Sequence, residues 1–338
     1  MTHDVVKPEK IVAIGVAALE EKLVLPKVMH LKGIDEYKGA KDDTINETVE
    51  GVLPYRSYGW RNDRSTAVVF DDYAERKVAL TFGGDTYNGV KLTDEQNEMD
   101  LPGWTKLAAK QADAVAFGLN AKAVNAVDAA PFEVLVTIDE ADVKGSLIKL
   151  RSVFNKLRVQ GRRSVVVGSD LEAALLSDDK LSLAQNVGDA EAVSALREAT
   201  LGRRFGFDFV AASEVDAATG YAMVDSAFVF LNAAPGVPQS VPFGARASQD
   251  GFQLRWIRDY DTDRQQDRSL FTTWQTFQYV NDPLVGKNGS DQAFVSTANH
   301  FVRAVKVELG AAYAVEIGNS ELATITGITS TDGTNDGA

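Results

Sequence analysis

A long, polar, turn-broken β-type segment, residues 32–97, constrains the fold of this chain more than any other feature. Within it a strand pattern runs from Thr66 to Phe82, and at about 3.3 Å per residue such a stretch extends roughly 50 Å. A compact domain has no core long enough to cover a strand of that length. We therefore expect the segment to leave its own domain and pack on another chain, which indicates assembly rather than catalysis.

The composition is that of a water-soluble globular protein without covalent cross-links. The 338 residues allow one large or two ordinary domains, and 45% of them are hydrophobic. No apolar run approaches the roughly 20 residues of a membrane span, and residues 1–4 lack the features of a secretory signal. Cysteine is absent, which excludes disulfides and thiolate metal sites. We expect a chain that folds in a reducing cytoplasm and has no membrane partner.

The formal net charge of -13 argues against a reader of nucleic acid, because phosphate binding needs clustered lysines and arginines. The same charge is compatible with a container wall that faces packed DNA without sticking to it. Acidity that serves only solubility is the simpler alternative.

Helical periodicity predicts three helices in the first half of the chain. They cover residues 9–23, 103–127 and 140–159. In the second helix an alanine-rich stripe recurs every three or four residues, through Ala108, Ala112, Val115, Leu119, Ala123 and Ala126. Asp100 and Pro102 are its expected start signals, and Asp139 is the expected N-cap of the third helix.

Strand patterns dominate the second half, so the order of elements predicts an α+β chain. A short helix near 169–177 interrupts them. The expected strands cover 164–167, 207–211, 221–231, 253–257, 271–280 and 301–309. Residues 318–338 are rich in glycine, threonine, serine and aspartate and predict no stable structure of their own.

Few residues suit catalytic chemistry. His3, His30 and His300 belong to no motif and are interpreted as surface or satisfied loop residues. Asp259, Asp261 and Asp263 resemble the opening of a calcium loop, but the positions for its glycine and glutamate hold other residues. The nearby arginines, Arg255, Arg258, Arg264 and Arg268, favour a salt-bridged turn or subunit interface over a metal site. The sequence thus predicts no catalytic residue, no cofactor and no metal.

Residues 55–64 combine three arginines with three aromatic side chains. This mixture fits stacking on nucleic acid, a protein interface or a solvated loop. We favour the interface, because the chain is acidic and the loop extends away from its domain. The candidate interface residues are Arg56, Trp60, Arg61 and Arg64, together with Arg258, Asp259 and Asp261.

Five blocks in order carry a family resemblance. They read ALEEKLVLP at 18–26, KGAKDDTI at 38–45, VKLTDEQ at 90–96, LGRRFGF at 201–207 and DGFQLRWIRDYD at 250–261, followed by DRS at 267–269. In this order they resemble the major capsid (coat) proteins of tailed double-stranded DNA bacteriophages, of the podovirus type, and their relatives in phages of actinobacteria. The resemblance spans roughly residues 10–310.

That resemblance implies a shell fold with named parts. Carried over by position, residues 1–31 form an N-terminal arm and 32–97 an extended β-hairpin loop. Residues 98–165 and 255–310 form a peripheral domain, whose long spine helix covers 103–127, and residues 166–254 form an axial domain. Residues 311–338 are a C-terminal tail.

The implied function is a structural capsid protein of the virion that self-assembles into hexamers and pentamers of an icosahedral shell around phage DNA. Implied partners are further copies of the chain, a separate scaffolding protein and a portal protein, with a decoration protein left open and DNA met only by proximity. One alternative is a nanocompartment shell protein of the same fold. The other is a soluble metal-dependent hydrolase that uses the acidic cluster from Asp259 to Asp267.

Overall fold

The computed structural model describes residues 7–33, 44–57, 60, 67–73, 75–96, 104–177, 202–241, 243–287 and 293–331. The chain folds into two compact units. Unit 1 comprises the described residues of 1–45, 79–129 and 228–278; unit 2 comprises those of 46–78, 130–227 and 279–338. No described helix is long and apolar enough to cross a membrane.

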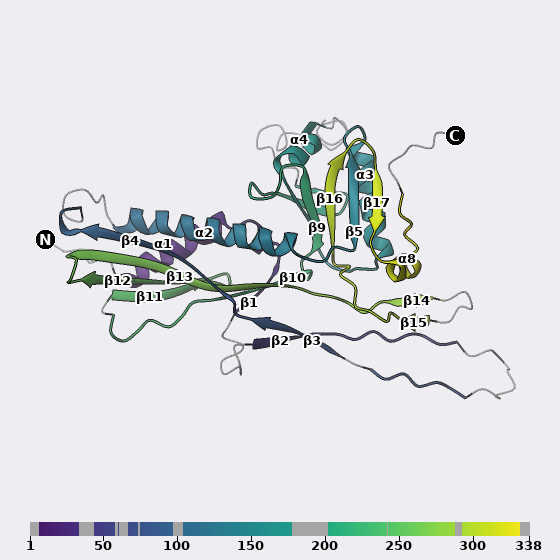
Figure 1. Ribbon diagram of the computed structural model, residues 1–338, viewed down its shortest axis with the longest axis horizontal. Helices are drawn as coiled ribbons and strands as arrows, with labels where there is room; N and C mark the ends of the chain where they lie inside the picture. The colour runs from purple at the N-terminus through teal and green to yellow at the C-terminus, as the bar shows by residue number, and fades with distance from the viewer. Residues whose placement is uncertain are drawn as a thin grey trace. The chain divides into compact units, whose positions relative to one another are not determined.

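Unit 1 is a six-stranded sheet with two helices against it (Figure 1). The sheet order is β1-β10-β13-β12-β11, and β4 pairs with β13 beside this path. Its elements are α1 (Pro8–Lys22), the 3₁₀ turn η1 (Leu25–Lys27), β1 (His30–Gly33), β4 (Gly84–Thr93), α2 (Trp104–Asp128), β10 (Phe228–Ala233), β11 (Phe243–Gln249), β12 (Phe252–Asp261) and β13 (Gln266–Tyr279). β1 runs parallel to β10, whereas β4, β11, β12 and β13 are joined by antiparallel pairs.

The core of unit 1 lies between α1, α2 and the sheet. α1 confirms the helix predicted over 9–23, and it buries Ile11, Val12, Val16 and Leu19. A β-carbon at Gly15 would lie 2.9 Å from Cε1 of Phe271, so the glycine lets this helix approach the sheet closely.

α2 confirms the predicted alanine-rich helix. Every member of the predicted stripe is buried except Ala126, which is half-buried, and Val127 is buried at the end of the stripe instead. Small side chains bring the backbone of α2 close to its neighbours α1 and β4. The expected start signals, Asp100 and Pro102, lie outside the described residues.

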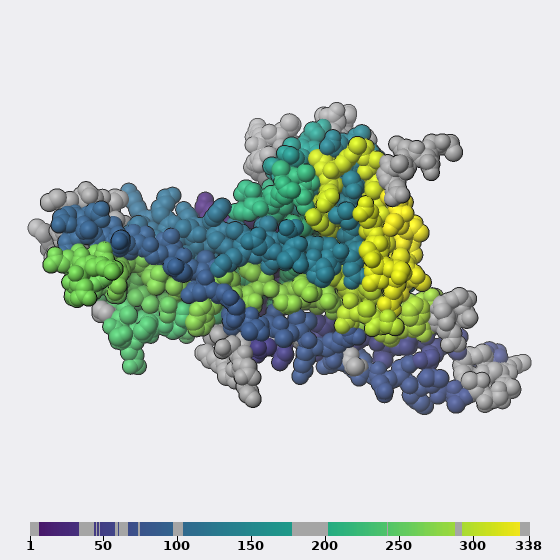
Figure 2. Space-filling model, viewed as in Figure 1, coloured from purple at the N-terminus to yellow at the C-terminus, as the bar shows by residue number. Residues whose placement is uncertain are grey.

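Unit 2 is built on a seven-stranded sheet in the order β17-β5-β16-β9-β6-β8-β7, with a separate β14–β15 hairpin. Its strands are β5 (Val134–Asp139), β6 (Arg163–Val167), β7 (Arg203–Arg204), β8 (Phe207–Ala211), β9 (Thr219–Val224), β14 (Val285–Lys287), β15 (Ala293–Val295), β16 (Ala304–Gly310) and β17 (Ala314–Ile317). Its helices are α3 (Val143–Lys156), α4 (Ser169–Ser177) and α8 (Ser320–Thr326). In Figure 2 the atoms of β16, β17 and α8, in yellow, form one continuous surface.

The hydrophobic core of unit 2 confirms the apolar face predicted for α3. Val143, Leu147, Leu150 and Phe154 of this helix are buried against side chains of β5, β6, β8, β9 and β16. The predicted N-cap was wrong. Asp139 still belongs to β5, and it is Asp142 whose carboxylate accepts a hydrogen bond from the Gly145 amide at 3.3 Å.

The predicted strand from Thr66 to Phe82 is largely absent. Within the described residues, 67–73 and 75 have no regular structure, and a strand, β3, covers only Arg76–Thr81. β3 pairs with β2 (Thr44–Val49) in a two-stranded sheet. An unpaired extended chain exposes its backbone groups to water, so periodicity alone could not define a strand there.

The tail is more ordered than its composition predicts. α8 lies within the stretch expected to have no stable structure, because Asn319 caps its N-terminus and Gly327, at φ 64°, ends it. Leu322 and Ile328 enter the core of unit 2. Residues 332–338 lie outside the described part of the chain.

The units divide the chain at other places than the predicted domain boundaries. The predicted boundary after residue 165 falls inside β6, which pairs with β8 and β9. The boundary after residue 254 falls inside β12, which pairs with β11 and β13. A strand that is hydrogen-bonded on both sides belongs to one sheet along its length. Segments 130–165 and 166–227 therefore share unit 2, and 228–254 belongs to unit 1.

Candidate subunit interface

The β2–β3 loop, residues 50–75, carries most of the exposed large apolar side chains. Eight of the fourteen such side chains among the described residues lie here: Val52, Leu53, Tyr55, Trp60, Val68, Val69, Phe70 and Tyr73. Trp60 is 90% exposed and Phe70 is 91% exposed. Single exposed apolar residues are normal, whereas a stretch of chain with this many makes the loop a candidate interaction surface.

Side-chain bonds hold the two limbs of this loop together. Nε of Arg56 donates to Oδ2 of Asp71 at 2.9 Å, and Nη2 binds the other carboxylate oxygen. The Gly51 amide donates to the Tyr73 hydroxyl at 3.4 Å. The hydrogen bond from Arg56 lowers the pKa of Asp71, so the carboxylate stays ionised in this pair. The described parts of the two limbs are therefore joined through side chains.

The four predicted interface residues of this loop have different outcomes. Arg56 binds a carboxylate of its own loop, although we expected a partner on an adjacent chain. Trp60 is exposed, and its place in an interface stays a prediction. Arg61 and Arg64 lie outside the described residues. Val68, Val69 and Phe70 were not among the predicted interface residues, because their run was interpreted only as part of the long strand from Thr66 to Phe82.

The charged end of the β12–β13 hairpin forms its own ion pairs. Nη2 of Arg258 lies 2.7 Å from Asp267, and its guanidinium stacks on Trp104 at 4.0 Å from the ring centroid. Arg268 binds Asp259 at 3.1 Å and Asp261 at 3.4 Å. The predicted pairing of acids with interleaved arginines is thus found for Arg258 and Arg268.

These pairs leave the acidic cluster without the geometry of a metal site. Within the described ranges, no group of three or more histidine, aspartate or glutamate side chains is placed to hold a metal ion. Each arginine restrains one or two carboxylates on neighbouring strands, so the cluster stiffens the hairpin end. Its place in a subunit interface stays a prediction.

A groove of about 570 Å³ crosses the sheet of unit 1 beside this charged end. It is lined by Gly89, Val90, Lys91, Val241, Ile257, Asp259, Arg268, Ser269 and Leu270. Half-buried apolar side chains lie along it, and the charged groups of Lys91, Asp259 and Arg268 surround them. An apolar floor with charged edges suits an extended peptide segment better than a small polar molecule.

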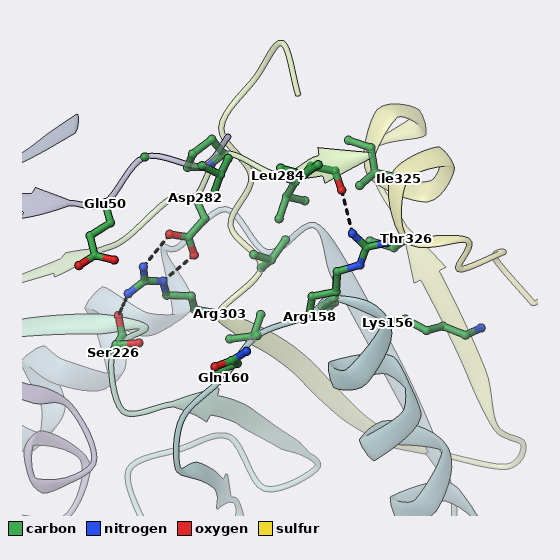
Figure 3. Close-up of a pocket in the computed structure, with 17 residues that line it drawn as sticks. Glu50, Lys156, Arg158, Gln160, Ser226, Asp282, Leu284, Arg303, Ile325 and Thr326 are labelled. Atoms are coloured by element: carbon green, nitrogen blue, oxygen red, sulfur yellow. Dashed lines mark hydrogen bonds and ion pairs between the residues drawn. The ribbon is translucent and has the colours of Figure 1, made fainter. Parts of the chain in front are cut away.

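A second cavity, of about 410 Å³, lies in unit 2 (Figure 3). Arg303 binds Asp282 with two hydrogen bonds of 2.6 Å and donates to the Ser226 carbonyl at 3.0 Å. Arg158 donates to the Val285 carbonyl at 3.0 Å. Arg303 thus joins a carboxylate and a backbone carbonyl, and Arg158 binds a backbone carbonyl. The residues that line the cavity include no histidine and no serine–histidine–aspartate triad.

Comparisons with known proteins agree on one fold. A family model described as phage capsid protein matches residues 84–276. No curated protein matches the chain. Among solved structures, that of Mycobacterium phage Che8 is 16% identical, with a TM-score of 0.57 over 84% of this chain and 90% of that one.

Two further capsids give similar values. The mature capsid of bacteriophage PhiM1 is 11% identical, with a TM-score of 0.54 over 85% of this chain and 87% of that one. The capsid of cyanophage P-SCSP1u is 8% identical, with a TM-score of 0.56 over 84% and 87%. At these identities the likeness shows a shared fold across both units.

Proposed function

This chain belongs to the phage capsid protein family, and from that premise we propose that its copies close into the hexamers and pentamers of an icosahedral shell around double-stranded DNA. The chain is a structural protein of the virion. Closed shells of this kind place one chain in several similar environments, so its contacts must tolerate small changes of angle. Apolar contacts tolerate such changes, because they lack the strict directionality of hydrogen bonds.

The exposed apolar side chains of the β2–β3 loop are the observation that carries this proposal. Fully burying a side chain such as Phe70 or Val68 contributes about 1.5–3 kcal/mol. Within the described part of its own chain, Phe70 remains 91% exposed, so burial against another molecule would supply that gain. The Arg56–Asp71 pair restrains the loop and lowers the entropy that docking would cost.

The groove on unit 1 is the receiving surface that we propose on the neighbouring copy. Val241, Ile257 and Leu270 offer apolar contact to residues such as Val68 and Phe70. An extended segment lies flat on a sheet, and its alternate side chains enter such a groove. Asp259 and Arg268, at the groove edge, belong to the predicted interface at the β12–β13 hairpin. In this proposal they would lie beside the docked β2–β3 loop of the neighbouring copy.

Within the shell fold we assign unit 1 to the peripheral domain and unit 2 to the axial domain. α2, with 25 residues, is the longest described helix and fits the spine helix of unit 1. The mixed sheet of unit 2, covered by α3 and α4, fits a compact domain at the capsomer centre. The β2–β3 loop fits the extended loop.

The other partners follow from this assignment. We expect a scaffolding protein during assembly, a portal protein at one vertex and DNA held only by proximity, with a decoration protein still open. We also infer that the chain is no enzyme, since the carboxylates Asp259, Asp261 and Asp267 are engaged by arginines. The family match favours this function over a nanocompartment shell or a metal-dependent hydrolase.

Phe70→Ser tests the proposal by removing the most exposed apolar ring of the loop. The purified chain is mixed with its scaffolding protein and examined by sizing chromatography and electron microscopy. We expect megadalton closed or curved particles from the parent chain and at least tenfold fewer from the variant, with an unchanged thermal melt. Phe70→Tyr keeps the ring area and should assemble like the parent.

Two outcomes would contradict the proposal. A parent chain that stays monomeric under all such conditions would exclude a shell protein. Normal particle yield from Phe70→Ser, combined with normal yield from Val68→Ser and Val69→Ser, would remove the loop from the interface.

A further inference from the structure

His300 occupies an unusual place for a residue in a loop. It lies between β15 and β16 in unit 2, and its side chain is fully buried. Its backbone pairs with Asp282 through two hydrogen bonds of 2.9 Å, one in each direction. These bonds fix the main chain at His300, and the assembly contacts proposed above do not use its ring.

A carboxylate oxygen faces each ring nitrogen. Nδ1 lies 2.8 Å from Oε2 of Glu133, and Nε2 lies 3.5 Å from Oε2 of Glu321. The first contact is a hydrogen bond, whereas the second lacks hydrogen-bond geometry and leaves Nε2 buried without a hydrogen-bonding partner. The other charged residue bound to His300 is Asp282, through its backbone, and its carboxylate is taken up by Arg303.

Both carboxylates are held in place by other donors. Oε1 of Glu133 accepts from the Phe301 amide at 2.9 Å. Glu321 accepts from the Thr297 amide at 2.8 Å and from its hydroxyl at 2.9 Å. The hydrogen bond from the Thr297 amide contributes most to lowering the pKa of Glu321, and the charge of His300 lowers this pKa further. Glu321 is thus kept as an anion.

The protonation state of the ring decides whether both carboxylates are satisfied. An ionised carboxylate only accepts hydrogen bonds, and a neutral imidazole donates from one nitrogen only. With the proton on Nδ1 for Glu133, the lone pair of Nε2 points toward the second anion. Only the doubly protonated ring can bind both, and histidine is the side chain that changes charge between about pH 5 and 8.

The two carboxylates come from elements that the ring joins. Glu133 directly precedes β5 in the central sheet, and Glu321 lies in the first turn of α8. α8 is otherwise held by the Asn319 cap, by the hydrogen bonds from Thr297 to Glu321 and by the buried side chains of Leu322 and Ile325. Its last residues, Ile325 and Thr326, form part of the cavity wall in Figure 3.

We propose that His300 is a proton-controlled clasp that holds α8 against the sheet of unit 2. Protonation completes the Glu133–His300–Glu321 chain and fastens the helix. Loss of the proton removes the Glu321 contact first, because it is the longer one and has no hydrogen bond to replace the charge. α8 then opens more readily, and so does the cavity that it helps to line. The clasp acts within one subunit and does not depend on shell assembly.

Amide hydrogen exchange of the unassembled full chain at pH 5.5 and 7.5 tests the clasp. After correction for the intrinsic rate of exchange, amides of 320–327 should be roughly tenfold better protected at pH 5.5 in the parent chain. Glu321→Gln keeps an acceptor for Thr297 and removes the charge, so it should lose this pH dependence, as should His300→Gln. His30→Gln, which changes an exposed histidine of β1, is the matched control and should retain it.

Each result decides the proposal. Loss of the pH dependence in Glu321→Gln and His300→Gln, but not in His30→Gln, supports the clasp. If His300→Gln fails to fold, Glu321→Gln alone carries the test. Protection of α8 that is equal at both pH values in the parent chain, or that keeps its pH dependence in Glu321→Gln, overturns the clasp.

Discussion

Two nearby residues of α3 illustrate how much a single side chain contributes to the stability of the fold. Leu150 is fully buried in the core of unit 2, whereas Ile148 is 49% exposed. Leu150→Ala should lower the free energy of unfolding by about 2–5 kcal/mol, because it removes packed methyl groups and leaves a cavity. Ile148→Ala, the control from the same helix, should change it by less than about 0.5 kcal/mol. Urea unfolding followed by circular dichroism measures both values.

The same helix offers a stricter check of its burial. Leu150→Asp places a carboxylate in an apolar core, so the chain should fail to fold or yield very little soluble protein. A well-folded Leu150→Asp protein would show that the buried face of α3 has been assigned to the wrong residues.

At the residue scale, periodicity located buried side chains but missed isolated ones. The helical spacing of Ala108, Ala112 and Leu119 is sufficient to place them on one face, and all three are buried. His300 belongs to no periodic pattern, and its burial follows from strands and a helix that come from separate parts of the chain. The interpretation as a surface or satisfied loop residue fits the hydrogen bond at Nδ1 but not the burial of the ring or the unpartnered Nε2.

At the scale of elements, the Arg56–Asp71 pair is what ties the limbs of the β2–β3 loop. Arg56→Asp and Asp71→Arg should each loosen the loop and lower particle yield, because like charges then face each other. The double variant restores opposite charges and should recover most of the yield. Particle counts by electron microscopy, with circular dichroism melts as a folding check, measure the effect.

The pair also has a defined dependence on pH. Arg56 lowers the pKa of Asp71 in the folded loop, so the pair contributes fully above the unfolded pKa of about 3.9. Its contribution is lost as the pH falls through the lowered value. Assembly at pH 5–8 should therefore be insensitive to this group. In the charge-reversal experiment, a double variant Arg56→Asp/Asp71→Arg that assembles no better than either single variant would show that Arg56 or Asp71 has another partner.

The sequence predicted helices better than the arrangement of strands. The ends of α1, α2 and α4 agree with the predicted ranges within a few residues, since a helix satisfies its hydrogen bonds locally. The long strand from Thr66 was wrong, because a strand needs a partner that its own sequence does not specify. A run such as Val68–Val69–Phe70 has the same sequence pattern whether its own core or another molecule covers it.

At the scale of the whole molecule, the net charge of -13 makes the rate of assembly depend on salt. Copies of an acidic chain repel one another, and salt screens that repulsion over about 10 Å at 0.1 M. Raising salt from about 0.01 to 0.15 M should therefore speed the assembly of the parent chain. Light scattering after mixing with scaffolding protein measures the rate.

The competing explanation is an interface that depends on charge pairs between copies of the chain. Such an interface weakens as salt rises, whereas burial of Phe70 and its neighbours does not. A rate that falls steadily over the same range of salt would show that charge attraction between subunits outweighs their apolar contacts.

The sequence by itself determined the class of fold, the main helices and the absence of cysteine chemistry. These depend on local periodicity and composition, which are properties of neighbouring residues. Only the tertiary structure decided where the units divide, since β6 and β12 join segments distant in the chain through pairing on both sides. It also decided that Arg56 pairs within its loop and that His300 lies between two carboxylates. Such contacts depend on which distant side chains meet, and sequence spacing does not encode that meeting.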